Sequence, residues 1–110
     1  MLNAAPIKTF TVTPLAVAGD AVTKMVATPH SRRSGFTVWN KATDGTELWV
    51  MLVALGGSAP AVPLLAAAHL RVKSDSIDTF FYGPDVDVYL VTNSAGATEI
   101  DVSVVEWSTH

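Results

Sequence analysis

The chain of 110 residues is 49% hydrophobic and only 15% charged, against about 25% charged residues in a typical globular protein, and it has a formal net charge of −3 and no cysteine. The lack of cysteine excludes disulfides, thiolate metal sites and cysteine nucleophiles, and the negative charge argues against nucleic-acid binding, which depends on clustered Lys and Arg. So few charges favour a protein that buries part of its surface in an assembly.

The N-terminal residues 1–7 contain no charged side chain and lack the basic start and long apolar centre of a secretion signal. We expect them to form an extended arm that reaches a neighbouring protein, and we expect no export signal. Alternation over residues 8–12 predicts the first strand, which Thr13-Pro14 should end. Residues 21–28 predict a second strand, and a loop with the sequence PHSRRSG follows at 29–35.

Residues 36–40 predict a third strand, because they are rich in β-branched and aromatic side chains. Asp44-Gly45 lies in a turn that should return the chain as a hairpin. The returning segment, 47–55, is apolar on both faces, which predicts a central strand covered by two layers of its own fold or by one layer and a partner. Its apolar run and that of 59–68 are far shorter than the about 20 residues that cross a bilayer, so no membrane span is expected.

Residues 64–69 suit either a short helical turn or an extended loop. Strands are expected at 70–73, 86–91 and 98–107, and Phe80-Phe81-Tyr82 either continues a strand or forms an aromatic plug. In the last strand, Ile100, Val102 and Val104 should face inward. Seven or eight short strands with frequent turns predict an all-β, single-domain, jelly-roll-like antiparallel β-sandwich over residues 1–110.

Charge is unevenly distributed along the chain. Residues 1–73 hold all 7 basic and 3 acidic residues, whereas 74–110 hold 7 acidic residues and no basic one, which gives +4 against −7. This asymmetry would favour head-to-tail contact between copies. Alternatively, strands that are distant in sequence interleave in the sandwich and cancel it.

No residue pattern indicates catalysis. The histidines at 30, 69 and 110 stand at no metal-ligand spacing. Asp85 and Asp87 share one face of a strand and could bind calcium, but solvated carboxylates are the simpler interpretation. We therefore predict that the protein is not an enzyme and has neither a metal nor a cofactor.

Three tryptophans are candidate recognition residues. Trp39 and Trp49 lie in strongly hydrophobic segments, so we expect both in the core, although aromatic rings can also form a platform for sugars. Trp107 lies near the end of the chain, where we expect an exposed ring that anchors a partner.

The segment RRSGFTVWN at 32–40 resembles a pattern in small virion proteins of tailed bacteriophages, in which a basic loop leads into a strand ending in Trp-Asn. LWVML at 48–52, VDVYLV at 86–91 and the small-residue turn NSAGAT at 93–98 follow in the same order, with Glu106 as the terminal acidic residue. The similarity covers residues 30–107, and it departs from the pattern at 66–69, where AAAH replaces a Pro-Gly-Glu turn.

The resemblance implies a β-sandwich that decorates or cements the outer surface of a phage capsid, often as a homotrimer. Its partners would be the major capsid protein and further copies of itself, with no nucleic acid and no membrane. The alternative is a receptor-binding or carbohydrate-binding module of a tail fibre, which would use exposed aromatic rings, Trp107 among them, and the Asp85–Asp87 loop. The candidate partner-binding residues are Leu2, Asn3, Ala4, Ala5, Pro6 and Ile7 of the arm, Arg32 and Arg33 of the basic loop, and Trp107.

Overall fold

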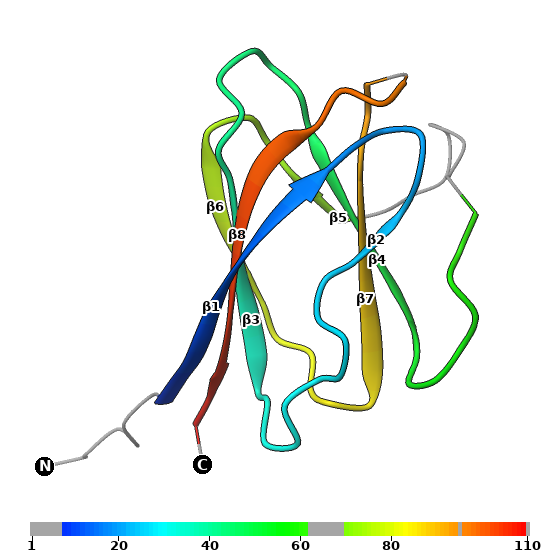
Figure 1. Ribbon diagram of the computed structural model, residues 1–110. Coiled ribbons are helices and arrows are strands. Elements are labelled where there is room, and N and C mark those ends of the chain that lie inside the picture. The colour runs from blue at the N-terminus through cyan, green and yellow to red at the C-terminus, as the bar shows by residue number, and fades with distance from the viewer. Residues whose placement is uncertain (1–7, 62–69, 95, 110) are drawn as a thin grey trace, which may run out of the picture.

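The computed structural model describes residues 8–61, 70–94 and 96–109 and places eight strands within them, arranged as two packed four-stranded sheets (Figure 1). The strands of sheet A are, in spatial order, β1 (Lys8–Val17), β8 (Ile100–Ser108), β3 (Gly35–Asn40) and β6 (Ser76–Phe80). Those of sheet B are β2 (Thr23–Lys24), β7 (Val86–Thr92), β4 (Leu48–Ala54) and β5 (Leu70–Val72). The described residues contain no helix, and hence none long and apolar enough to cross a membrane. The prediction of an all-β sandwich is confirmed.

The strand order is that of a jelly roll. Strand β1 pairs with β8, β2 with β7, β3 with β6 and β4 with β5, every pair antiparallel, as if one long hairpin had been folded over. The pairs β3–β8 and β4–β7 then join these ribbons into the two sheets. This nesting of two Greek keys brings the beginning and the end of the chain together on neighbouring strands.

The core lies between the sheets, and its larger cluster of buried residues is apolar. Because successive side chains of a strand point to opposite faces, each strand contributes every second residue to it. Ile100, Val102 and Val104 of β8 face inward as expected. The buried members of this cluster are Val17, Met25, Phe36, Val38, Ala42, Leu48, Val50, Val72, Val88, Leu90, Ile100, Val102 and Val104.

The outer face of sheet B is also buried. Trp49 and Met51 of β4 pack there with Tyr89 and Val91 of β7, and Val22, from the connection before β2, covers part of them. Strand β4 is therefore central and covered on both sides, as its sequence predicts. Trp49 is buried as expected, but in this second cluster on the outer face of sheet B and not between the sheets.

Three details differ from the sequence predictions. Strand β1 continues through Pro14 to Val17, because it is an edge strand, where proline breaks no ladder to a second neighbour. The second strand is reduced to Thr23–Lys24. The expected hairpin at Asp44-Gly45 is wrong, since β3 and β4 belong to different sheets and residues 41–47 form an arch between them. The ambiguous segment 64–69 lies outside the described residues.

A second arch, residues 73–75, joins β5 to β6, and the buried amide of Asn40 ties the two arches together. Asn40 Nδ2 donates to the carbonyls of Thr46 and Val72 at 2.9 and 3.1 Å, and its Oδ1 accepts from the Ala42 N–H at 3.0 Å. Ser74 Oγ adds a bond of 2.7 Å to the Ala42 carbonyl. The sequence suggests a hairpin at this turn, but the Asn40 side chain holds it as an arch between the two sheets.

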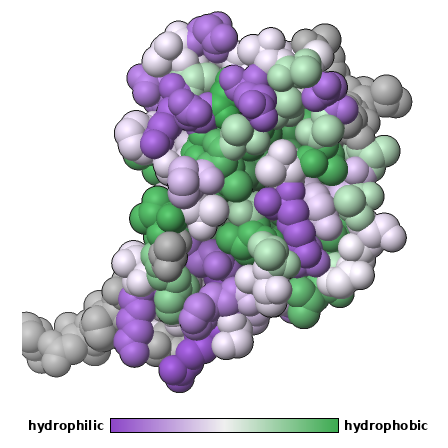
Figure 2. Space-filling model, viewed as in Figure 1, coloured by the Kyte–Doolittle hydropathy of each residue, from purple (hydrophilic) through white to green (hydrophobic). Residues whose placement is uncertain are grey.

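The basic first part and the acidic last part of the chain lie close together in the fold, so the charge asymmetry along the sequence is smaller in the folded molecule. Lys24 pairs with Asp87 at 3.6 Å and Arg33 with Glu106 at 3.1 Å, so bases from the first part of the chain meet acids from the last. The alternative of interleaved strands is the better interpretation. Figure 2 shows hydrophobic residues reaching the surface among polar ones, as the low charged fraction implies.

We expect Asn40→Ala to lower the free energy of unfolding by about 3 kcal/mol, because it leaves a buried N–H and two carbonyls without this partner and each such group costs about 1–3 kcal/mol. Asn93→Ala is the control, since the Asn93 side chain accepts a single exposed bond from the Glu47 N–H, and its loss should cost about 1 kcal/mol or less. Urea denaturation measures both. Equal losses would show that Asn40 does not hold the arches.

Candidate functional site

The candidate site lies at one end of the sandwich, where β1 begins and β8 ends, beside the β2–β3 and β6–β7 connections (Figure 1). We call it the terminal end. Arg32, Arg33 and Trp107, predicted separately as partner-binding residues, all lie here. Residues 2–7 precede Lys8 at the same end of β1, but they lie outside the described residues.

Arg33 is not a surface residue, contrary to its predicted role as a direct contact, because it is only 1% exposed. Its guanidinium donates to Glu106 Oε2 at 3.1 Å and to the carbonyls of Tyr82, Gly83 and Val86 at 3.2, 2.7 and 2.8 Å. Two of these four bonds hold the β6–β7 connection, and a third holds the first residue of β7. Arg33 therefore fixes the shape of that loop from inside, whereas Arg32 is exposed.

Glu106 connects this network to the β2–β3 connection. Its Oε2 also accepts from the His30 N–H at 3.1 Å, and the His30 ring stacks on Phe10 of β1 with the ring centroids 3.6 Å apart. The Arg33 guanidinium lies 5.4 Å from the centre of the Phe36 ring. The buried Arg33–Glu106 ion pair thus ties β8 to the β2–β3 connection, the β6–β7 connection and the start of β7.

Trp107 is also buried, 8% exposed, so the expectation of an open ring is wrong. The indole lies across Gly35 of β3, where an added Cβ would come within 2.4 Å of both Trp107 Cζ2 and the Phe80 carbonyl oxygen. The expectation failed because the indole near the chain end packs against the sheet, in the space that Gly35 leaves by having no side chain. The ring in turn supports Phe81, which meets it edge-on at 5.5 Å.

Phe81 is the exposed aromatic of the terminal end. It is 77% exposed, and its neighbour Tyr82 is 36% exposed. The loop that carries both is held by Arg33, and on its other side Pro84 and Asp85 line an open groove of about 420 Å³ with Pro29 and Leu55. The sequence left open whether 80–82 continues a strand or forms an aromatic plug, and the structure ends β6 at Phe80. The sequence did not indicate which ring faces solvent, because that depends on the Arg33 contacts.

Trp39 is the second exposed aromatic, which corrects its assignment to the core. It lies on the outer face of β3 and is 41% exposed, with the Lys41 ammonium 4.8 Å from its ring centre. The hydrophobic context was misleading because Phe36 and Val38, on the alternate positions, supply the core.

The residues considered for metal binding do not come together. Asp87 is 3% exposed and bonds to Lys24 and to the Gly56 N–H, so it is not the solvated carboxylate that we expected, whereas Asp85 is exposed. No group of three His, Asp or Glu side chains that could hold an ion occurs within residues 8–61, 70–94 and 96–109. His69 and His110 lie outside these ranges.

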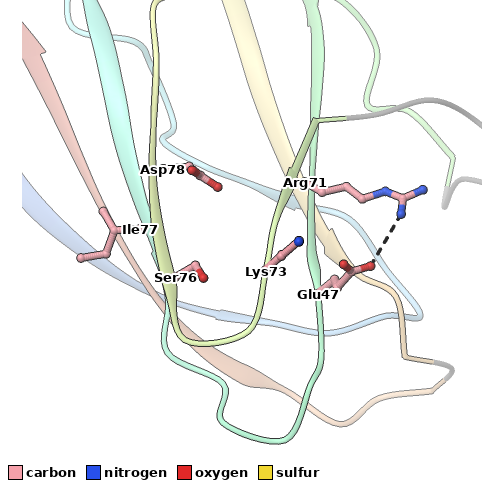
Figure 3. Close-up of a pocket in the computed structure, with 6 residues that line it drawn as sticks. All are labelled: Glu47, Arg71, Lys73, Ser76, Ile77 and Asp78. Atoms are coloured by element: carbon pink, nitrogen blue, oxygen red, sulfur yellow. Dashed lines mark ion pairs between the residues drawn. The ribbon is translucent and has the colours of Figure 1, made fainter.

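A mixed-charge groove of about 480 Å³ lies between the edge strands β5 and β6 (Figure 3). Figure 3 shows Lys73 and Asp78 beside it and the Arg71–Glu47 ion pair, 3.7 Å long, at its margin. These side chains are solvated and of both signs, so such a pair contributes little to stability. The groove has no buried polar group that would select a ligand.

No family model, curated protein or solved structure matches this chain. The function is therefore argued from the terminal end and from the surfaces beside it.

We expect Arg33→Met to destabilise the fold by about 3–5 kcal/mol, because it leaves the Glu106 carboxylate buried without its ionic partner. Arg32→Ala, one residue earlier and exposed, should change stability by no more than about 0.5 kcal/mol. Adding Glu106→Gln to Arg33→Met should restore part of the loss, since it removes the uncompensated charge. Thermal or urea unfolding of the parent protein, the two single variants and the double variant measures these effects. A double variant that is no more stable than Arg33→Met would contradict the ion-pair interpretation.

Proposed function

We propose that this chain is a virion structural protein that decorates and stabilises a bacteriophage capsid by binding between subunits of the major capsid protein on its outer surface. The proposal combines the resemblance of residues 30–107 to small phage virion proteins with the jelly-roll fold, an architecture that viral capsid domains use often. Because one fold serves many functions, the fold alone does not decide the matter.

The observation that carries the proposal is an exposed aromatic ring on a loop that a buried arginine holds by hydrogen bonds. Phe81 is 77% exposed, and its loop is fixed by hydrogen bonds from the buried Arg33. An apolar anchor held in one conformation loses little entropy on binding, and aromatic anchors often dominate the energy of protein interfaces. Such an end suits docking onto a protein surface.

Binding to a shell needs many modest contacts rather than reaction chemistry. Apolar contact contributes about 25 cal/mol per Å² before the costs of association, and a protein present in many copies multiplies it. The low charged fraction of 15% reduces repulsion between copies that are crowded on one particle. We infer binding without catalysis on this basis.

The alternative, a carbohydrate-binding module of a tail fibre, loses two of the residues that we assigned to it, although Asp85 is exposed. Trp107 is 8% exposed and Asp87 is 3% exposed, so neither offers a surface for a sugar ring. Trp39 is accessible, but Lys41 already occupies one side of its ring. Capsid decoration is therefore the function that we put to the test.

Quantitative mass spectrometry of particles from the phage that encodes this chain should find hundreds of copies per particle, and empty capsids should co-sediment with the purified protein. Phe81→Glu should weaken capsid binding at least about tenfold, because it places a charge on the apolar anchor. Ala97→Glu is the control, since it adds the same charge on the exposed β7–β8 connection. A handful of copies, or equal binding by both variants, would contradict the proposal.

Deletion of residues 1–7 tests the arm separately. We expect the shortened chain to keep its unfolding midpoint, because Lys8–Val17 still pairs with β8, and to lose capsid binding. Circular dichroism and co-sedimentation measure the two effects. Unchanged occupancy of capsids by the shortened chain would refute the role of the arm.

A further inference from the structure

The outer faces of the two sheets differ in how much of their apolar surface is exposed to solvent. On sheet B, the chain itself buries Trp49, Met51, Tyr89 and Val91. On sheet A, large apolar side chains stay open to solvent: Val12 is 58%, Trp39 41% and Ile77 60% exposed. Exposed apolar residues are ordinary when they are scattered, so what matters is whether these three adjoin one another.

The strand register places them in two adjacent rows. One row crosses sheet A as Val12, Val105, Thr37 and Thr79, each opposite the next on the neighbouring strand. The other row, two positions along each strand, is Pro14, Ser103, Trp39 and Ile77. We call these eight residues the apolar band. None of them is charged, and the band spans all four strands.

Two of the three hydroxyl groups in the band are hydrogen-bonded to each other and do not need water as a partner. The hydroxyls of Thr37 and Thr79 bond to each other at 3.0 Å. Val12, Trp39, Ile77 and Val105 line a shallow groove of about 200 Å³ on this face. Figure 3 shows the Ile77 side chain on the opposite side of β6 from those of Ser76 and Asp78.

We propose that the apolar band binds the same band of a second copy of this chain, sheet against sheet. An uncharged surface can meet its own copy without repulsion between like charges, which a charged face could not do. The nearest charges at its border, Asp101 next to Ser103 and Lys41 over Trp39, are of opposite sign and so do not give the border a single sign. Sheets that pack face to face lie about 10 Å apart and interdigitate their side chains, as exposed Trp39 and Ile77 would do.

The size of the face sets the strength of this contact. Four strands spaced about 4.8 Å apart, each contributing the about four residues of about 3.3 Å that two outward rows span, give a face of about 19 by 13 Å, or about 250 Å² per copy. A standard specific interface takes about 800 Å² per partner. The pair is therefore weak and reversible, and it forms at high protein concentration or where copies are held close together.

A face that binds its own copy generates a two-fold pair, because the same patch serves both partners. The resemblance to phage virion proteins implies trimers instead, which need two different patches on each subunit. The arrangement of the band favours the pair. The proposal does not depend on capsid binding and can fail or succeed without it.

Analytical ultracentrifugation of the full chain from about 1 µM to about 1 mM tests the pair. We expect a monomer at the low end and a dimer at the high end, with Trp39→Glu and Ile77→Glu each raising the dissociation constant at least about tenfold. Ala97→Glu, which adds the same charge away from sheet A, should dimerise like the parent protein. Circular dichroism establishes that each variant is folded.

Three outcomes would overturn the proposal: a monomer at every concentration, a trimer, or folded Trp39→Glu and Ile77→Glu variants that both dimerise as strongly as the parent. A dimer that both substitutions weaken and Ala97→Glu does not would establish the band as the contact surface.

Discussion

Everything in this molecule depends on the packing of two sheets through alternate side chains. Each strand of sheet A gives one set of residues to the core and presents the other set outward, so Phe36 and Val38 stabilise the fold while Thr37 and Trp39 remain available. Each fully buried Val, Leu or Phe contributes about 1.5–3 kcal/mol, so burial of this core is a main favourable contribution to folding. The outward set is then free to serve recognition.

The sequence predicted the class of fold because period-two alternation is a local property. It identified β4 as a strand covered on both sides, and it placed Ile100, Val102 and Val104 inward. It failed at 41–47, where the same turn residues suit a hairpin and an arch alike. The choice between them depends on Asn40 reaching the Val72 carbonyl 32 residues away, a contact that no local pattern contains.

The candidate site was predictable in position but not in role. Arg32, Arg33 and Trp107 do gather at one end, yet Arg33 and Trp107 are buried supports and Phe81 is the exposed ring. Arg33 looked like a surface residue because arginine is seldom buried without partners. Its partners are the distant Glu106, two loop carbonyls and the carbonyl of the first residue of β7. Trp39 was expected to be buried and Trp107 exposed, and the structure shows the reverse. Gly35, which has no side chain, leaves room for the Trp107 indole, and nothing comparable covers Trp39.

Pro14 has a consequence beyond the length of β1. Edge strands offer unpaired N–H and C=O groups on which other chains can assemble into cross-β fibrils, and a protein with so few charges has little else to prevent this. Strand prolines occur where the missing N–H would face solvent, so Pro14 interrupts the template along the open side of β1. The same residue that belongs to the apolar band thereby directs self-association toward a closed pair and away from open-ended aggregation.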